Sequence, residues 1–244
     1  MIPLSDENPT LHTPVMTWAL LGAMFAVWLT VQNAGLNEVQ LATSICKYGM
    51  VPGELTHRAR IGTGVPIAPH LACVVDNDPI NKLTPLTSMF LHGGWGHILG
   101  NALFFWVFGN NIEDKMGSLR YAIFYLLSGV VATLAHVAAQ PDSTVPLIGA
   151  SGAIAGVMGA YLVLFPRVRI RTVFIFFFIL IRDVPAMWLL LAWFVLQFFT
   201  GNSSGVAWVA HVGGFAFGAL VALIFRSRLQ PGPPPAPPAW RGGY

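Results

Sequence analysis

Apolar residues occur along this chain in long runs, and short segments carrying the charged and turn-forming residues separate the runs. A bilayer core of about 30 Å requires roughly 20 mostly apolar residues in a helix. The pattern predicts six membrane spans, at residues 14–32, 94–111, 119–139, 147–165, 185–200 and 205–225. A seventh run, Thr172–Ile181, is too short to span and lies between arginines. It is expected to be an interfacial or re-entrant segment, and Pro185 is expected to begin the fifth span.

Composition supports a membrane environment. Charged residues make up 9% of the chain, hydrophobic residues 55%, and the mean hydropathy is +0.65. Soluble domains carry about 25% charged residues, so the chain is interpreted as a polytopic membrane protein. The basic residues are scattered through short loops and form no stripe, which argues against a nucleic-acid partner. The N-terminus lacks the basic segment and cleavage site of a signal peptide, so the first run is expected to remain as a span.

The distribution of basic residues predicts the orientation. Six spans place both termini on one side of the membrane, and loops on the cytosolic side carry the excess of Lys and Arg. Nine basic residues lie in the loops on the side of the termini and four on the other side. We therefore expect a cytosolic tail at 1–13, a membrane domain at 14–225 with a long external loop at about 33–85, and a Pro-rich cytosolic tail at 226–244. The expected location is a bacterial inner membrane.

Four polar residues inside the predicted spans fall at a similar depth. His97 and Asn101 lie four residues apart on one face of the second span, Ser151 lies in the fourth, and His211 in the sixth. These three spans run in the same direction. At about 1.5 Å per residue, all four side chains are roughly 5–10 Å below the outer end of their span. They are expected to meet in one shallow layer.

Glycines predict that two of these spans pack closely. Gly152 and Gly156 form a Gly-xxx-Gly pair in the fourth span, and Gly214 and Gly218 form another in the sixth. Such pairs let two membrane helices approach. We expect this contact to bring Ser151 close to His211.

A serine beside a histidine is the minimal nucleophile and base. The fourth and sixth spans contain no Asp or Glu, so the prediction is a Ser-His dyad. A group other than a carboxylate must then orient the histidine ring, and Trp208 is a candidate packing partner. Backbone N–H groups near Ser151, with the side chains of His97 and Asn101, are candidate oxyanion donors. Each feature alone has a structural explanation, such as a serine bonded to its own helix. Their combination favours catalysis.

Three blocks of sequence then suggest a family: HGGWGHILGN at 92–101, GASG at 149–152 and AHVGG at 210–214, with GNNIEDKMG at 109–117 as a fourth. The chain resembles the rhomboid intramembrane serine proteases from about Leu83 to Phe225. The resemblance implies an all-α, six-transmembrane-helix bundle whose active site opens to the extracytoplasmic side. It implies no cofactor and no metal, and single-pass transmembrane proteins as substrates.

The resemblance also assigns roles to residues. It makes Ser151 the nucleophile and His211 the general base and then acid, with His97 and Asn101 as oxyanion donors. Supporting roles fall to four residues: Gly149 and Gly152 shape the turn at the nucleophile, His92 is structural or binds water, and Gly214 belongs to the third block.

Two positions depart from the family pattern. Some relatives have a tyrosine four residues after the serine, stacked on the histidine, where this chain has Ala155. Some carry a Trp-Arg pair in the first external loop, where this chain has NKLTPLTSMF.

Two alternative functions stay open: a catalytically silent relative that binds membrane-protein clients, and a small transporter, although no internal repeat is visible.

Cys46 and Cys73 are the two cysteines of the chain, and both lie in the predicted external loop. Three alternatives remain: a disulfide, two free thiols, or a metal site completed by His57 and His70. Because the loop is distant in sequence from the catalytic blocks, its reduction is expected to leave the dyad largely intact.

Overall fold

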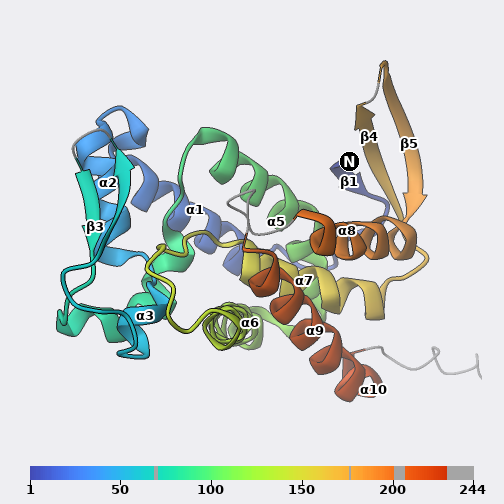
Figure 1. The fold of residues 1–244 in the computed structure, drawn as a ribbon. Helices are drawn as coiled ribbons and strands as arrows, with labels where there is room; N and C mark the ends of the chain where they lie inside the picture. The colour runs from blue at the N-terminus through green and yellow to red at the C-terminus, as the bar shows by residue number, and fades with distance from the viewer. Residues whose placement is uncertain (69–70, 176, 201–206, 230–244) are drawn as a thin grey trace, which may run out of the picture.

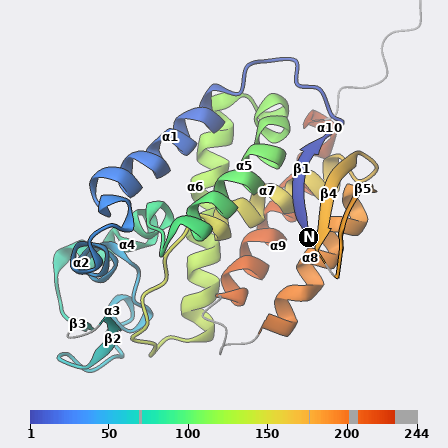
Figure 2. The ribbon, with the colours of Figure 1, turned by 90° about the horizontal axis from the view of Figure 1, so that it is seen from above.

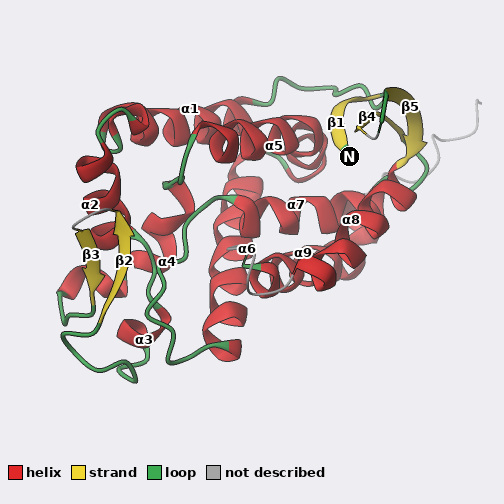
Figure 3. Cartoon of the chain, turned by 45° about the horizontal axis from the view of Figure 1, so that its top comes forward, coloured by secondary structure: helices red, strands yellow, loops and turns green. Residues whose placement is uncertain are grey.

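The structure, a computed structural model, describes residues 1–68, 71–175, 177–200 and 207–229. It is mostly helical (Figure 3). A long helix overlaps each of the six predicted spans: α1 (Val15–Thr30), α5 (Trp95–Met116), α6 (Ser118–Ala139), α7 (Ser151–Leu164), α8 (Ala186–Thr200) and α9 (Trp208–Ile224). The short helices are α2 (Glu38–Tyr48), α3 (Pro52–Leu55), α4 (Thr84–Thr87) and α10 (Arg226–Leu229), with 3₁₀ turns at Asn33–Gly35, Pro79–Lys82 and Ser88–Phe90.

Most of the long helices are shorter than the predicted spans. Within the described residues, α6 is the one helix that is both long and apolar enough to cross a bilayer, and α1, α7, α8 and α9 are apolar but shorter. The number of spans therefore remains a prediction. The Pro-rich segment from Gln230 onward lies outside the described residues.

Two small antiparallel sheets lie at opposite ends of the helical bundle (Figures 1 and 2). One has the order β1-β4-β5, formed by β1 (Ile2–Asp6), β4 (Arg169–Ile175) and β5 (Ile179–Pro185); the other pairs β2 (Gly64–Ala68) with β3 (Leu71–Val74). The prediction of an all-α fold is thus corrected to a mostly helical fold with two sheets.

The predicted interfacial segment Thr172–Ile181 is part of the β4–β5 hairpin. The pairing runs from Arg169 opposite Pro185 to Ile175 opposite Ile179. A period of two is visible at the start of β4, where Ile170 and Thr172 are buried and Arg169 and Arg171 are exposed. The sequence did not indicate the strands, because an unbroken apolar run does not distinguish a hairpin from a short helix. The interfacial or re-entrant position of the segment stays a prediction. The helix that corresponds to the fifth predicted span, α8, begins at Ala186, directly after Pro185.

The fourth block, GNNIEDKMG, ties the N-terminal segment to the end of α5. The carboxylate of Glu113 accepts hydrogen bonds from the backbone N–H groups of Met16 and Thr17, at 2.8 and 2.7 Å, and from the hydroxyl of Ser118. Asp114 accepts from the N–H groups of Leu11 and His12. Glu113 thereby caps the first turn of α1, which has no side-chain cap of its own.

Asp6 anchors β1 to the helices. Its Oδ2 accepts from Asn111 Nδ2 and from the Tyr161 hydroxyl, both at 2.6 Å. Burial raises the pKa of the Asp6 carboxyl, and the bond from Tyr161 acts in the opposite direction. Residues Ile2–Asp6 of the N-terminal tail therefore form a strand that packs against α5 and α7.

Glycines allow α7 and α9 to touch backbone to backbone. A Cβ built on Gly214 would overlap the carbonyl oxygen of Gly152, and one on Gly218 would overlap that of Gly156. A side chain on either residue of α9 would push the helices apart. The predicted close contact between the fourth and sixth spans is confirmed.

The long loop between α1 and α5 is a compact unit closed by a disulfide. Cys46 of α2 and Cys73 of β3 are bonded, with their Cα atoms 5.0 Å apart. This pairing excludes the free-thiol and metal-thiolate alternatives in the structure; His70 lies outside the described residues.

The same loop contacts the segment that leads to Ser151. Met50, which follows α2, forms a two-way backbone bridge with Leu147, with N···O distances of 3.0 and 2.7 Å. The loop is therefore in contact with the segment before Ser151 although it is distant in sequence. The expectation that reduction leaves the dyad largely intact stays a prediction.

We predict that Gly218→Ala weakens the packing of α7 and α9. The added methyl meets the backbone of Gly156, which cannot move like a side chain. Gly22→Ala in α1 is the matched control, because a Cβ there meets nothing within 4 Å. The thermal midpoint in detergent should fall by several degrees for Gly218→Ala and stay level or rise for Gly22→Ala. Equal midpoints for the two variants would contradict the packing argument.

The disulfide gives a second prediction. Cys46 and Cys73 are separated by 27 residues, and closing a loop of this size stabilises the fold by about 3.5 kcal/mol in the chain-entropy model. Mass spectrometry of non-reduced protein should find the two cysteine peptides linked, and Cys46→Ser should lower the free energy of unfolding. Alkylation of both cysteines without a reductant would show that the bond is absent.

Candidate active site

Ser151 and His211 meet where α7 and α9 begin. His211 Nε2 lies 2.7 Å from Ser151 Oγ, a hydrogen bond between residues 60 positions apart. Ser151 is the first residue of α7 and His211 the fourth of α9. The sequence had placed Ser151 about one turn inside its helix. Its helix starts later than expected because Gly149 adopts a φ of +116°, which no helix contains.

Gly149 shapes the turn before the serine. Its N–H donates to the carbonyl of Ser88 at 2.9 Å, which fixes the approach to α7. A Cβ at this position would lie 2.7 Å from His97 Nε2. The positive φ and the close ring together require glycine here. The backbone can therefore pass directly beside the ring of His97.

His97 and Asn101 of α5 face the same turn. The N–H of Gly93 donates to His97 Nδ1 at 3.3 Å, so the ring proton lies on Nε2, the nitrogen that faces Gly149. Asn101 is buried, and its Nδ2 has no hydrogen-bond partner among the described residues. Two N–H donors thus lie beside the turn at Gly149, two residues before Ser151, where they could stabilise a developing anion.

His92 supports His97. Its ring packs edge-on against that of His97, with centroids 5.1 Å apart. Its backbone exchanges two hydrogen bonds of 2.8 Å with the side-chain amide of the buried Gln32 in the segment after α1. The two bonds hold the chain in place just before α5.

The structure adds two residues of α8 that the sequence analysis did not identify. Gln197 Oε1 lies 2.7 Å from His211 Nδ1, and the ring of Trp193 lies beside that of His211, with centroids 5.7 Å apart. The predicted packing partner, Trp208, contacts Phe198. The sequence contains a signal for Gln197, since it is a polar residue inside a predicted span.

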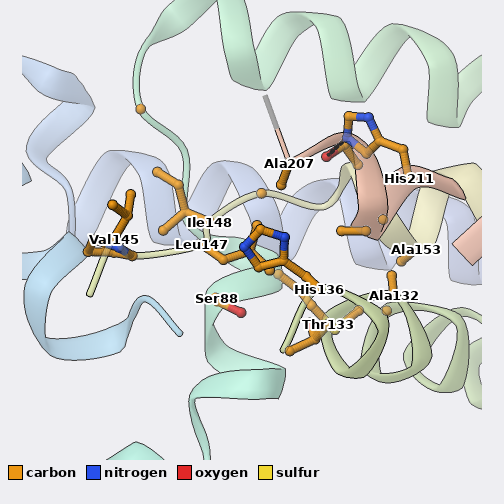
Figure 4. Close-up of a pocket in the computed structure, with 18 of the residues that line it drawn as sticks. Ser88, Ala132, Thr133, His136, Val145, Leu147, Ile148, Ala153, Ala207 and His211 are labelled. Carbon is orange, nitrogen blue, oxygen red and sulfur yellow. Dashed lines mark hydrogen bonds between the residues drawn. The ribbon is translucent and has the colours of Figure 1, made fainter. Parts of the chain in front are cut away.

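A cavity of about 620 Å³ opens onto these groups. Ser151, His97 and His211 line it, together with His136 of α6, another histidine that the sequence analysis passed over. Figure 4 shows the rings of His136 and His211 at this cavity, reaching it from α6 and α9. Within the described ranges, no group of three or more His, Cys, Asp or Glu side chains is placed to hold a metal ion.

Comparisons with known proteins support this picture. The family model for the rhomboid domain matches residues 82–228. Over 57% of the chain, the sequence is 31% identical to the rhomboid protease AarA of Providencia stuartii and 30% identical to the putative rhomboid protease YdcA of Bacillus subtilis. It is 27% identical to the RHOMBOID-like protein 5 of Arabidopsis thaliana over 92% of the chain. The matches cover 54%, 65% and 73% of these three proteins, respectively.

The matched residues include every block that carries the site, from His92 to Gly214. Rhomboid proteins are integral membrane proteins, in agreement with the composition. This chain belongs to the rhomboid family.

Proposed function

We propose that this protein is an intramembrane serine endopeptidase that hydrolyses peptide bonds in or near the transmembrane segments of single-pass membrane proteins. The observation that carries the proposal is the 2.7 Å hydrogen bond between Ser151 Oγ and His211 Nε2 at an open cavity. The names of relatives do not decide the matter, since some contain the word protease and others only rhomboid-like. A silent, client-binding relative has no use for this pair.

The geometry supports a two-step acyl transfer. Ser151 Oγ attacks the substrate carbonyl carbon while its proton passes to His211 Nε2. The C–N bond then breaks as His211 returns that proton to the leaving amine, which leaves an acyl ester on Ser151. Water next attacks the ester with His211 again as base, and the serine hydroxyl is restored.

The negative oxygen formed at each step requires donors. His97 Nε2–H and Asn101 Nδ2 face the turn at Gly149, and the first N–H groups of α7 have no partner within their own helix. The positive end of the α7 dipole further stabilises a negative charge at this position. The proposed oxyanion site is therefore built from α5 and from the backbone at Ser151.

The proposed setting is a lipid bilayer crossed six times, with both termini in the cytosol of a bacterial cell and the site toward the outer face. The support is the overlap of a helix with each predicted span and the excess of basic residues on the side of the termini. A substrate helix must unwind locally to reach Ser151, because its peptide bonds are otherwise shielded.

The first test of this proposal removes the nucleophile and the base. Ser151→Ala and His211→Ala should each abolish cleavage of a model transmembrane substrate, and the double variant should lose no more, because both act in one step. Labelling by a serine-reactive fluorophosphonate should disappear in parallel. Ser128→Ala is the control, since that hydroxyl bonds the carbonyl of Phe124 in its own helix. Substantial turnover by Ser151→Ala would refute the mechanism.

The oxyanion role of Asn101 gives another test. Asn101→Ala should lower kcat by about 10²-fold through loss of one donor, with KM little changed. Asn110→Ala, on the same helix, is the matched control because the side-chain oxygen of Asn110 accepts hydrogen bonds from the neighbouring Asn111. An unchanged kcat would assign Asn101 a structural role.

A further inference from the structure

Gln197 is buried at the interface of α8 with α9, beside the proposed base. It is 6% exposed, and its Oε1 lies 2.7 Å from Nδ1 of His211. This nitrogen is on the side of the ring opposite the bond to Ser151. The imidazole is therefore held between a hydroxyl and an amide, each at hydrogen-bond distance.

The orientation of the amide is fixed by its own helix. Gln197 Nε2 donates to the carbonyl of Trp193 at 3.1 Å. A carbonyl only accepts hydrogen bonds, so the amide nitrogen must face Trp193 and the amide oxygen must face His211. An oxygen in that position accepts a hydrogen bond from the N–H group at Nδ1. The neutral ring then carries its proton on Nδ1 and presents a free lone pair on Nε2 to Ser151.

Trp193 adds a second contact from the same face of α8. It lies four residues before Gln197, and its ring lies beside the imidazole with centroids 5.7 Å apart. One helix therefore supplies both a bond at the edge of the ring and a packing surface. These contacts come from α8, whereas an aromatic residue at position 155 would have come from α7.

We propose that Gln197 is a positioning residue that selects the Nδ1–H tautomer of His211 and aims Nε2 at Ser151. This role rests on the proposed function, in which His211 is the base. An aspartate would do the same and also stabilise the charged ring, whereas an amide is neutral. Gln197 therefore fixes the tautomer and the direction of the ring without adding a negative charge to the apolar interior.

The neutral amide has a consequence for pH dependence. Gln197→Glu keeps an acceptor of the same reach and adds a negative charge that favours the protonated ring. Because the base must be neutral to act, the acidic limb of the pH–rate profile should move to higher pH in this variant. Two other titratable side chains of the described residues line the same cavity as His211, namely His97 of α5 and His136 of α6, and both are the same in all variants.

The kinetic test compares three variants with the wild type. Gln197→Leu has no acceptor and should lower kcat by about 10- to 100-fold with KM within about threefold. Gln197→Glu should recover most of kcat above neutral pH and show the shifted acidic limb. Leu196→Ala, an exposed neighbour on α8, is the control and should keep wild-type kinetics.

A spectroscopic test is independent of activity. In protein labelled with ¹⁵N-histidine, the His211 signals, assigned by their absence in His211→Ala, should report Nδ1–H in the wild type and a mixture of tautomers in Gln197→Leu. Wild-type kcat in Gln197→Leu, or an unshifted limb in Gln197→Glu, would overturn the role of Gln197 and leave the protease intact. A wild type with Nδ1–H that neither cleaves nor reacts with fluorophosphonate would instead overturn the proposed function, and with it any catalytic role of Gln197.

Discussion

The contact between α7 and α9 is the constraint on which the site depends. Lipid supplies no hydrophobic force between apolar helices, so the association of the two relies on close packing. Gly214 and Gly218 allow it, because the carbonyls of Gly152 and Gly156 occupy the space where side chains would lie. With the backbones this close, residues at the start of each helix come within hydrogen-bond reach, and Ser151 bonds His211 at 2.7 Å.

A second constraint holds the turn that leads to the serine. Gly149 bonds Ser88, and Leu147 forms a backbone bridge with Met50, so the turn is fixed from two directions. The bridge joins the disulfide-closed loop between α1 and α5 to the chain two residues before Gly149. On the other side of the molecule, Glu113 and Asn111 secure α1 and β1. Polar contacts at both ends of the bundle thus set the positions of the helices. The apolar surfaces alone do not determine how these helices pack against one another.

The helices were predictable because long apolar runs in this composition have few alternatives, and the Ser-His pair was predictable because polar residues in such runs are rare. The β4–β5 hairpin was not, since Thr172–Ile181 has no alternation that would reveal a strand. Gln197 was overlooked although it is as polar as Asn101 and lies in a predicted span. It belongs to none of the three sequence blocks, and its importance appears only through its contact with His211.

The sequence by itself determined the membrane environment of this protein, the approximate ranges of its long helices, its family and the identity of the proposed nucleophile and base. Each follows from local composition or from residues within one short block. The tertiary structure decided that Cys46 joins Cys73, that the tail from Ile2 pairs with β4, and that α8 rather than α7 supports the ring of His211. These features are contacts between segments far apart along the chain, and local patterns leave them undetermined, because many pairings satisfy the same apolar and polar positions.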